Sequence, residues 1–311
     1  MISGQKLLYN LDNLRERKPI TADIFLNDYC NNKCPYCSYA RYGENNRQWM
    51  AFEDFKTYAE ILKGLGVKGF ILTGGGEPTI SKDFDKITSW MEEQGLSYGI
   101  NTNFNVLKYI KPTFLKVSLD GWDEDSYQAK RGVRKYGKVL DNLTKYLDWK
   151  AENNITTSVG IQTVVMSSED VIRFYEANKD LGIDYMNFRP VESTGGKYYE
   201  GKDIRDIIRT MEDLNKKDSR VTVNYKWYKV GTKFERCFAH CTQIALNQRG
   251  EVIFCCHKPY EVVGHITDVD IMDKLRKAET NIAMCDVPCR LTGPNELVRD
   301  LERGCADSGF I

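Results

Sequence analysis

Short apolar runs alternate with longer amphipathic stretches over the first two thirds of this 311-residue chain. The pattern indicates strand–helix units and a mostly parallel sheet. Strands are predicted at Ala22–Asn27, Phe70–Thr73, Tyr98–Thr102, Leu115–Leu119, Val159–Val165 and Tyr185–Arg189. Helices are predicted at Phe52–Lys63, Phe84–Glu93, Val139–Asn153 and Glu169–Leu181, with a short one at Val106–Ile110. Six such strands can form an open doubly wound sheet or a curved partial barrel, and periodicity does not separate the two.

The last third of the chain is more broken. Gly195 and Gly196 mark a loop that leaves the sixth predicted strand, and we place a domain boundary there. Beyond it we expect a helix at Ile204–Leu214, strands at Val221–Tyr225, Gln243–Leu246 and Val252–Phe254, and short helices near Ile271–Ala278 and Asn295–Arg303. The last two strands should form a hairpin around Gly250. The expected units are therefore a barrel or sheet domain (1–195), a linker helix and strand (196–235) and a small C-terminal domain (236–311).

The overall charge argues against nucleic-acid and membrane partners, and the cysteines point to metal binding or catalysis. Lys and Arg number 44, as do Asp and Glu, so the net charge of zero gives no general attraction for nucleic acid or anionic lipid. The chain opens without a signal peptide, and no apolar stretch reaches the ~20 residues that span a bilayer. We therefore expect a cytoplasmic protein without a nucleic-acid or membrane partner. In that reducing compartment, ten cysteines favour metal binding or catalysis over disulfides.

Three of the cysteines, Cys30, Cys34 and Cys37, directly follow the first predicted strand. Barrels and open α/β sheets build their active sites at this carboxyl end of the strands. Three closely spaced thiolates can hold three corners of a cubane iron–sulfur cluster and leave its fourth iron without a protein ligand. A structural zinc site would need a fourth ligand nearby, and the three histidines lie at positions 240, 257 and 265. The spacing therefore favours iron over zinc.

The Cys-x3-Cys-x2-Cys spacing, with Tyr36 before the last cysteine, resembles that of the radical SAM superfamily. The resemblance implies that the three cysteines hold a 4Fe–4S cluster. Its fourth iron would bind the amino and carboxylate groups of S-adenosylmethionine, with Tyr36 near the adenine. The resemblance also implies an α/β fold, a partial (β/α)6 TIM-like barrel with a small C-terminal auxiliary-cluster domain. It thereby selects one of the two sheet architectures left open above.

A glycine-rich element closes the second predicted strand. The sequence Thr73-Gly-Gly-Gly-Glu77 is similar to the family's Gly-Gly-Glu element. The resemblance implies that Gly75, Gly76 and Glu77 receive the methionyl ammonium of the cofactor. Glycine lets the backbone approach a ligand closely, and a carboxylate offers an acceptor. A plain turn is the alternative interpretation of a glycine run after a strand.

Polar residues also end the later strands. Ser118 belongs to a Ser-x-Asp-Gly element and Arg131 to an Arg-Gly step. By resemblance they contact the ribose and carboxylate of the cofactor, and Gln162 on the fifth strand is a further candidate. Capping of turns and helices is the alternative for each. The family's commoner Thr-Asn-Gly is replaced here by Thr102-Asn103-Phe104.

Seven more cysteines lie beyond residue 236. Two close pairs brought together by a hairpin would form a tetrathiolate site, and spacing alone leaves zinc and a second cluster open. The element resembles the SPASM or shorter twitch extension of radical SAM enzymes, which carries auxiliary 4Fe–4S clusters, and this favours iron. Two cysteines of the full SPASM pattern are missing. We therefore expect one auxiliary 4Fe–4S cluster held by Cys237, Cys241, Cys255 and Cys289, with Cys285 as a substitute for Cys289.

The remaining thiols and several carboxylates are candidates for catalysis. Cys256 or Cys305 would return a hydrogen atom to a substrate radical, as an epimerase requires; the plainer interpretation is a small buried hydrophobe. Candidate bases are Asp120, Asp123 and Glu192, each near the carboxyl end of a strand. Solvated or capping carboxylates are the alternative.

The resemblance implies a reaction. An electron from the reduced cluster cleaves S-adenosylmethionine to a 5′-deoxyadenosyl radical, which abstracts hydrogen from an unactivated carbon. Only 29 residues precede Cys30, which favours a small polar substrate, sugar- or aminoglycoside-like, and an epimerase or dehydrogenase. The alternative substrate is a ribosomal peptide that receives a crosslink or an epimerised residue. Flavodoxin or ferredoxin would supply the electron. The non-enzymatic alternative is a zinc-stapled binding protein.

Overall fold

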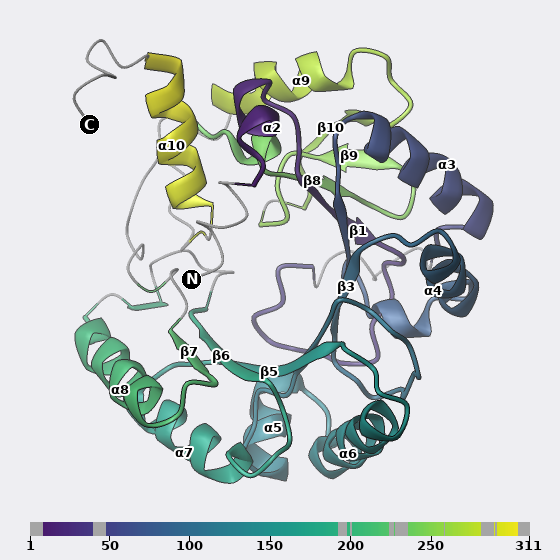
Figure 1. Cartoon of the computed structure of the whole chain (residues 1–311). Coiled ribbons are helices and arrows are strands. Elements are labelled where there is room, and N and C mark those ends of the chain that lie inside the picture. The colour runs from purple at the N-terminus through teal and green to yellow at the C-terminus, as the bar shows by residue number, and fades with distance from the viewer. Residues whose placement is uncertain are drawn as a thin grey trace.

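The computed structural model describes residues 9–39, 48–191, 198–199, 201–223, 227, 236–257, 259–280, 289 and 291–303. Six parallel strands follow in chain order: β1 (Thr21–Phe25), β2 (Gly69–Thr73), β3 (Tyr98–Thr102), β4 (Phe114–Ser118), β5 (Ser158–Val164) and β6 (Tyr185–Arg189). They form a curved sheet with one concave side, as Figure 1 shows. The six predicted strands and the partial barrel are confirmed.

Further strands extend this sheet at both edges. The strand β7 (Val221–Val223) pairs in parallel with β6, and β8 (Gln243–Leu246) pairs in parallel with β1. Two antiparallel strands follow, β9 (Glu251–Ile253) and β10 (Val262–His265). The order in the described residues is β10-β9-β8-β1-β2-β3-β4-β5-β6-β7. The predicted hairpin is confirmed as β8–β9. The C-terminal unit predicted from residue 236 thus shares one sheet with the barrel.

Helices cover the convex side of the sheet (Figure 1). They are α3 (Phe52–Gly64), α4 (Phe84–Glu93), α5 (Glu124–Arg131), α6 (Tyr136–Glu152), α7 (Ser168–Asn178) and α8 (Ile204–Lys217). The main core lies between them and the sheet, and alternate strand residues supply it, such as Ile24, Leu72 and Ile100, which are fully buried. The intervening strand residues face the concave side.

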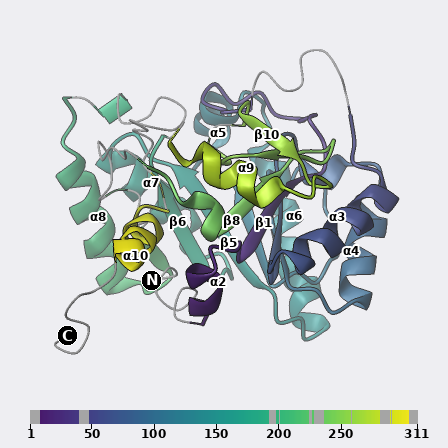
Figure 2. The same ribbon diagram turned by 90° about the horizontal axis from the view of Figure 1, so that it is seen from above.

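Three more helices lie near the open side of the barrel. They are α2 (Leu11–Arg15), α9 (Ile271–Lys277) and α10 (Thr292–Arg303). The two ends of the described chain meet there, because α10 contacts α2, as Figures 1 and 2 both show. Within the described ranges, no helix has the length and apolar character needed to cross a bilayer.

One predicted element is absent, because the segment expected as a short helix at Val106–Ile110 runs as a loop. The helices α2 and α5 and the strand β10 were not predicted from the sequence. Only Tyr127 and Lys130 of α5 are buried, so the helix shows no apolar periodicity, and β10 is four residues long with a glycine inside.

Candidate functional site

The cysteine loop leaves β1 and is supported from beneath by the end of α5. The amide of Lys33 donates to the carbonyl oxygen of Arg131 over 3.0 Å. Gly132 ends α5 with a φ of +71°, and a Cβ there would lie 2.2 Å from the carbonyl oxygen of Lys33. Only glycine accepts both this left-handed backbone and so close an approach. The C-terminal end of α5 thus fixes the position of the loop that carries Cys30, Cys34 and Cys37.

A second support joins the loop to the end of β3. The side-chain amide of Asn103 donates to Asn31 Oδ1 over 2.6 Å and approaches Cys30 Sγ at 3.8 Å. The backbone amide of Asn103 donates to Glu77 Oε2 over 2.7 Å. The segment Thr102-Asn103-Phe104 therefore connects the cysteine loop to the glycine-rich element. Phe104 has a φ of +57°, a conformation that glycine takes at little cost.

The carboxylate of Glu77 is buried and fully engaged. Its Oε1 accepts hydrogen bonds from the Thr79 amide over 3.2 Å, from the Thr79 hydroxyl over 2.7 Å and from Thr102 Oγ1. Burial raises the pKa of Glu77, and the hydrogen bond from the Asn103 amide opposes this shift. The carboxylate therefore joins the ends of β2 and β3 within the protein. Its predicted role toward the methionyl ammonium stays a prediction.

The glycine run packs against the cysteine loop itself. A Cβ on Gly76 would lie 1.8 Å from the carbonyl oxygen of Tyr29, and one on Gly75 would lie 2.8 Å from that of Asn27. The amide of Gly76 donates to the Asn27 carbonyl over 2.8 Å. In the described structure, the space that these glycines leave is filled by the backbone that follows β1. The run therefore holds the ends of β1 and β2 together.

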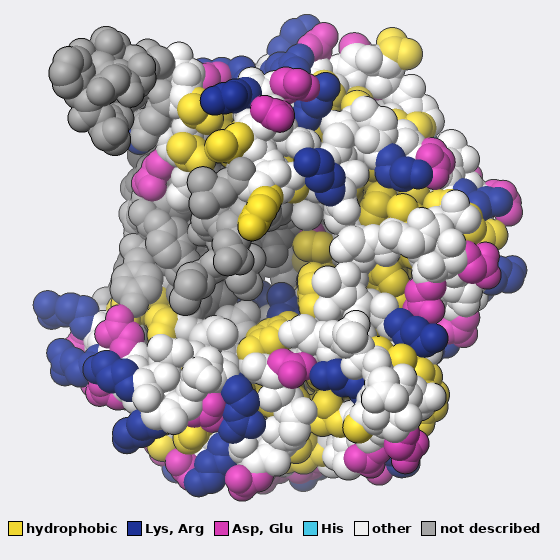
Figure 3. Space-filling model, viewed as in Figure 1, with side chains coloured by type: hydrophobic (Ala, Val, Ile, Leu, Met, Phe, Trp, Pro, Cys, Tyr) yellow, Lys and Arg dark blue, Asp and Glu magenta, His cyan; other side chains and the backbone are white. Residues whose placement is uncertain are grey.

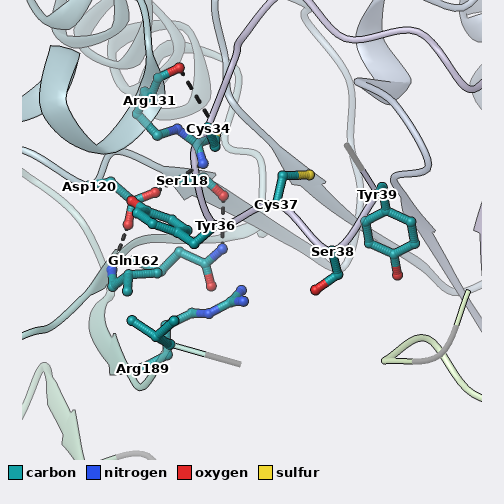
Figure 4. A pocket seen from close by; sticks show the side chains of 12 residues that line it. Cys34, Tyr36, Cys37, Ser38, Tyr39, Ser118, Asp120, Arg131, Gln162 and Arg189 are labelled. Atoms are coloured by element: carbon teal, nitrogen blue, oxygen red, sulfur yellow. Dashed lines mark hydrogen bonds and ion pairs between the residues drawn. The ribbon is translucent and has the colours of Figure 1, made fainter. Parts of the chain in front are cut away.

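A cavity of about 140 Å³ opens beside the cysteine loop at the carboxyl ends of β4, β5 and β6. The face drawn in Figure 3 is hollowed near its centre, above the concave side of the sheet. The lining residues, most of them drawn in Figure 4, are Cys34, Tyr36, Cys37, Ser38, Tyr39, Ser118, Asp120, Arg131, Gln162, Val164, Arg189 and Val191. Ser118 and Gln162 are register partners on β4 and β5, and Gln162 Nε2 donates to Ser118 Oγ over 2.8 Å. Five predicted residues, Tyr36, Ser118, Asp120, Arg131 and Gln162, therefore line this cavity with two of the three cysteines.

The hydroxyl of Tyr36 and Oε1 of Gln162 are buried in the cavity lining and have no hydrogen-bond partner among the described residues. A buried polar atom without a partner costs free energy, so such atoms indicate a polar ligand. Arg189, at the end of β6, brings a guanidinium to the same cavity (Figure 4). Arg189 was not predicted from the sequence as a site residue. Its position at the end of β6 was a usable signal, because Ser118 likewise ends β4.

Asp120 and Arg131 form a buried ion pair at the edge of the cavity. Asp120 Oδ2 lies 3.0 Å from Arg131 Nη1, and Asp120 Oδ1 accepts from the Val164 amide over 2.5 Å. Both carboxylate oxygens are therefore engaged within the protein, one by Arg131 and one by the backbone at the end of β5. We assign Asp120 to positioning Arg131 and do not carry it forward as a base.

The other two candidate bases have different outcomes. Asp123 caps α5: its carboxylate accepts from the Ser126 amide, and this hydrogen bond lowers the pKa of Asp123. The capping alternative is thus confirmed for Asp123. Glu192 lies outside the described residues, as do Cys285 and Cys305.

The surroundings of Cys30 and Cys34 disfavour the thiolate form of these two side chains. Desolvation, followed by the Glu77 carboxylate, raises the pKa of Cys30 to about 12. Desolvation also raises the pKa of Cys34, although Arg131 opposes the shift. Among the described residues, no group of three His, Cys, Asp or Glu side chains is arranged to hold a metal ion. A bound cationic centre would have to draw the three thiols together and remove their protons.

The C-terminal cysteines fall into separate surroundings. Cys255 is close enough to Cys256 and Cys289 for each to raise its pKa, with contact to the Cys256 thiol as the largest cause. Cys237 accepts a 3.5 Å hydrogen bond from Asn295 Nδ2 on α10. Cys241 is fully buried in a different apolar cluster, with its Sγ 3.5 Å from His240 Nε2. The structure thus brings Cys255 and Cys289 together and places Cys241 apart from them.

Comparison with protein-family profiles matches the chain to the radical SAM superfamily over residues 24–209. This range covers more than half of the chain and includes the cysteine loop, the glycine-rich element and the cavity lining. The chain belongs to the radical SAM superfamily. Radical SAM enzymes use a 4Fe–4S cluster and S-adenosylmethionine, so the unpartnered polar atoms beside Cys34 and Cys37 fit a cofactor with ribose hydroxyls and an amino-acid moiety.

Individual relatives are distant. A probable GTP 3′,8-cyclase from Saccharolobus islandicus is 23% identical over 203 residues, which cover 62% of this chain and 64% of that protein. The match therefore spans less than two thirds of the relative's length. Among solved structures, Streptococcus suis SuiB bound to the precursor peptide SuiA has a TM-score of 0.65, with 19% identity over 86% of this chain and 68% of that one. Native anSMEcpe with bound AdoMet has a TM-score of 0.63, with 17% identity over 85% and 82%. At such low sequence identity, the structural likeness shows a shared fold alone.

Proposed function

We propose that this radical SAM chain abstracts a hydrogen atom from a small polar substrate, sugar- or aminoglycoside-like, and acts as an epimerase or dehydrogenase. The observation that carries the proposal is the guanidinium of Arg189, which ends β6 and lines the polar cavity beside Cys34 and Cys37. A guanidinium suits a substrate that carries several hydrogen-bond acceptors. The cytoplasmic setting and a flavodoxin- or ferredoxin-type donor stay predictions.

The cofactors supply the difficult chemistry and the chain supplies position. When bound, the cluster and S-adenosylmethionine provide hydrogen-atom abstraction from an unactivated carbon. Cys30, Cys34 and Cys37 would hold the cluster. Tyr36, Ser118 and Gln162 would bind the nucleoside and amino-acid parts of S-adenosylmethionine. The ion pair with Asp120 would hold the Arg131 guanidinium beside the carboxylate of that cofactor.

An auxiliary 4Fe–4S cluster in the C-terminal unit forms part of this proposal. The proximity of Cys255 to Cys289 supports it, and Cys237 is joined to α10 nearby through Asn295. Cys241 would have to leave its buried cluster to serve as the fourth ligand, and Cys285 is the substitute ligand. Iron analysis separates the alternatives: two clusters give about eight iron atoms per chain, and a zinc-stapled binding protein gives none.

Cys256 is the proposed hydrogen donor for an epimerase. It packs with Tyr39, a cavity-lining residue, against an apolar cluster that includes Phe25. Phe25 alternates with Ile24 of the main core, so this cluster lies on the concave side of β1. In the donation the S–H bond breaks and a C–H bond forms on the substrate. One electron from the external donor and one proton from solvent then restore the thiol.

The Cys256→Ala variant tests the epimerase. We expect turnover to disappear while cleavage of S-adenosylmethionine continues, because only the returning hydrogen atom is lost. The measurement is 5′-deoxyadenosine and product formed under anaerobic conditions, with deuterium-labelled candidate sugars to identify the attacked carbon. Product formation at the wild-type rate would remove Cys256 from the reaction and leave the dehydrogenase.

A ribosomal peptide is the second candidate substrate. It is favoured by the likeness in fold to SuiB bound to its precursor peptide and to anSMEcpe with a bound peptide. Deuterium from a labelled precursor peptide, and not from labelled sugars, would then appear in 5′-deoxyadenosine.

A further inference from the structure

Tyr39 lies between the two groups of cysteines, and no motif or proposed role described above accounts for it. Its hydroxyl donates a 2.6 Å hydrogen bond to the carbonyl oxygen of Cys256, which is 217 positions later in the chain. Its ring packs edge-on against Phe25, with the ring centroids 5.1 Å apart and the planes at 80°. Tyr39 also lines the cavity together with Cys37, whose thiol points toward the side where Tyr39 lies (Figure 4). One side chain therefore touches the cavity, β1 and the C-terminal segment.

The environment of Cys256 differs from that of its neighbour Cys255. Cys256 packs with Tyr39 against the concave-side cluster of Phe25, Ala245 and Ile253. Cys255 packs instead against the main core, as Cys237 and Cys289 do. Cys256 therefore packs on the cavity side, and its thiol also contacts that of Cys255. The hydrogen bond from Tyr39 is made to the backbone of Cys256, where it holds this residue in place.

We propose that Tyr39 is the positioning residue that fixes Cys256 at the cavity side of the C-terminal segment. The proposal rests on the proposed function in one respect, because it gives Cys256 the part of hydrogen donor. The hydroxyl holds the Cys256 backbone, and the ring holds the Tyr39 side chain against β1. The C-terminal segment is thereby attached to the cysteine loop two residues after Cys37.

The Tyr39→Phe variant tests the hydroxyl while keeping the ring. A neutral hydrogen bond is worth about 1 kcal/mol, so local opening of the Cys256 segment should become roughly fivefold more frequent. The measurement is the rate of iodoacetamide alkylation of Cys256 in the reconstituted, iron-loaded protein, read by peptide mass spectrometry. Iron-bound thiols are protected there, so the reaction reports on Cys256. Amide hydrogen exchange over residues 251–257 is the second readout, and it should quicken in the same variant.

Tyr146→Phe is the matched control. Tyr146 is a buried tyrosine of α6 whose hydroxyl donates to the Ile110 carbonyl oxygen over 2.8 Å. We expect alkylation of Cys256 to rise about fivefold in Tyr39→Phe and to stay at the wild-type rate in Tyr146→Phe. Equal rates in Tyr39→Phe and wild type, or equal acceleration in both variants, would overturn the proposal.

The alkylation test stands apart from the test of the reaction. If Cys256→Ala still forms product, the donor role fails, and the alkylation rates still decide whether Tyr39 positions Cys256. If both roles hold, Tyr39→Phe should form less product for each 5′-deoxyadenosine released, with cleavage of S-adenosylmethionine unchanged.

Discussion

Phe104 is the residue at which local backbone geometry and burial conflict most clearly. Its φ of +57° lies in the left-handed region, which costs a residue with a side chain roughly 1 kcal/mol. Yet the ring is fully buried and meets Tyr146 edge-on, with the ring centroids 5.9 Å apart. The burial of an aromatic side chain exceeds the backbone cost. A phenylalanine therefore stands where the family more often has glycine, and the turn still delivers Asn103 to Glu77 and Asn31.

At Phe104 a glycine variant should be more stable than an alanine variant, the reverse of the usual order in a helix. Removing the ring destabilises the fold by about 3–5 kcal/mol in either variant. Phe104→Gly also removes the backbone strain and Phe104→Ala keeps it, so the glycine variant should be more stable than the alanine variant by about 1 kcal/mol. Urea unfolding of both variants provides the measurement.

Phe174 is the control for this order. It is fully buried in α7, where the backbone is helical and alanine is preferred to glycine by about 1 kcal/mol. The alanine variant should therefore be the more stable one at position 174. The same order at both positions would contradict the assigned strain at Phe104.

At the scale of elements, the C-terminal end of α5 supports the cysteine loop. Gly132→Ala introduces a Cβ 2.2 Å from the Lys33 carbonyl oxygen at a φ of +71°. We expect a loss of stability of about 2–4 kcal/mol, from strain and overpacking together, and reduced iron loading because the loop shifts. Urea unfolding and iron content after reconstitution measure the two effects.

Gly95→Ala isolates the backbone term. Gly95 has a φ of +63°, and a Cβ there would meet nothing within 4 Å. This variant should lose about 1 kcal/mol and bind iron like the wild type. Equal losses of iron in the two variants would show that contact with Lys33 does not set the position of the loop.

The elements that the sequence predicts well are those with strong periodicity. The six strands of the barrel and the long helices carry apolar residues in clear register, and the structure has them within a few residues of the predicted bounds. The helix α5 escapes prediction because its stability comes from capping by Asp123 and Ser126 and from contact with the cysteine loop, not from an apolar face. The strand β10 depends on pairing with β9, which no local pattern reveals.

Part of the candidate site was also predictable from the sequence. Spacing identifies the three cysteines, and the resemblance to the family points to Ser118 and Gln162, which line the cavity as register partners. The role of Glu77 within the protein was not predictable, because its donors Thr79, Thr102 and Asn103 come from two separate segments. The contact between Tyr39 and Cys256 joins residues 217 positions apart, and only the folded chain brings them together.

Across the whole molecule, the sheet and an ion network around the buried Glu279 unite the two ends of the chain. The pairing of β8 with β1 places the C-terminal segment directly beside the strand that carries the cysteine loop. The Glu279 carboxylate contacts Arg17 from the N-terminal region and Arg236, and both arginines also contact Glu302 on α10. Removing both arginines would leave the charge of the buried Glu279 uncompensated. The C-terminal unit is therefore built into the barrel wall.

We propose that Cys30, Cys34 and Cys37 hold a cubane cluster with one iron open to S-adenosylmethionine. The decisive measurement is electron paramagnetic resonance of the anaerobically reconstituted, reduced protein in which Cys237, Cys255 and Cys289 are changed to serine. This variant removes the proposed auxiliary ligands and leaves one cluster to observe. We predict a 4Fe–4S signal that changes when S-adenosylmethionine is added and that disappears when Cys34 is also changed to serine. A protein that shows no such signal, or a signal that S-adenosylmethionine leaves unaltered, would contradict the account.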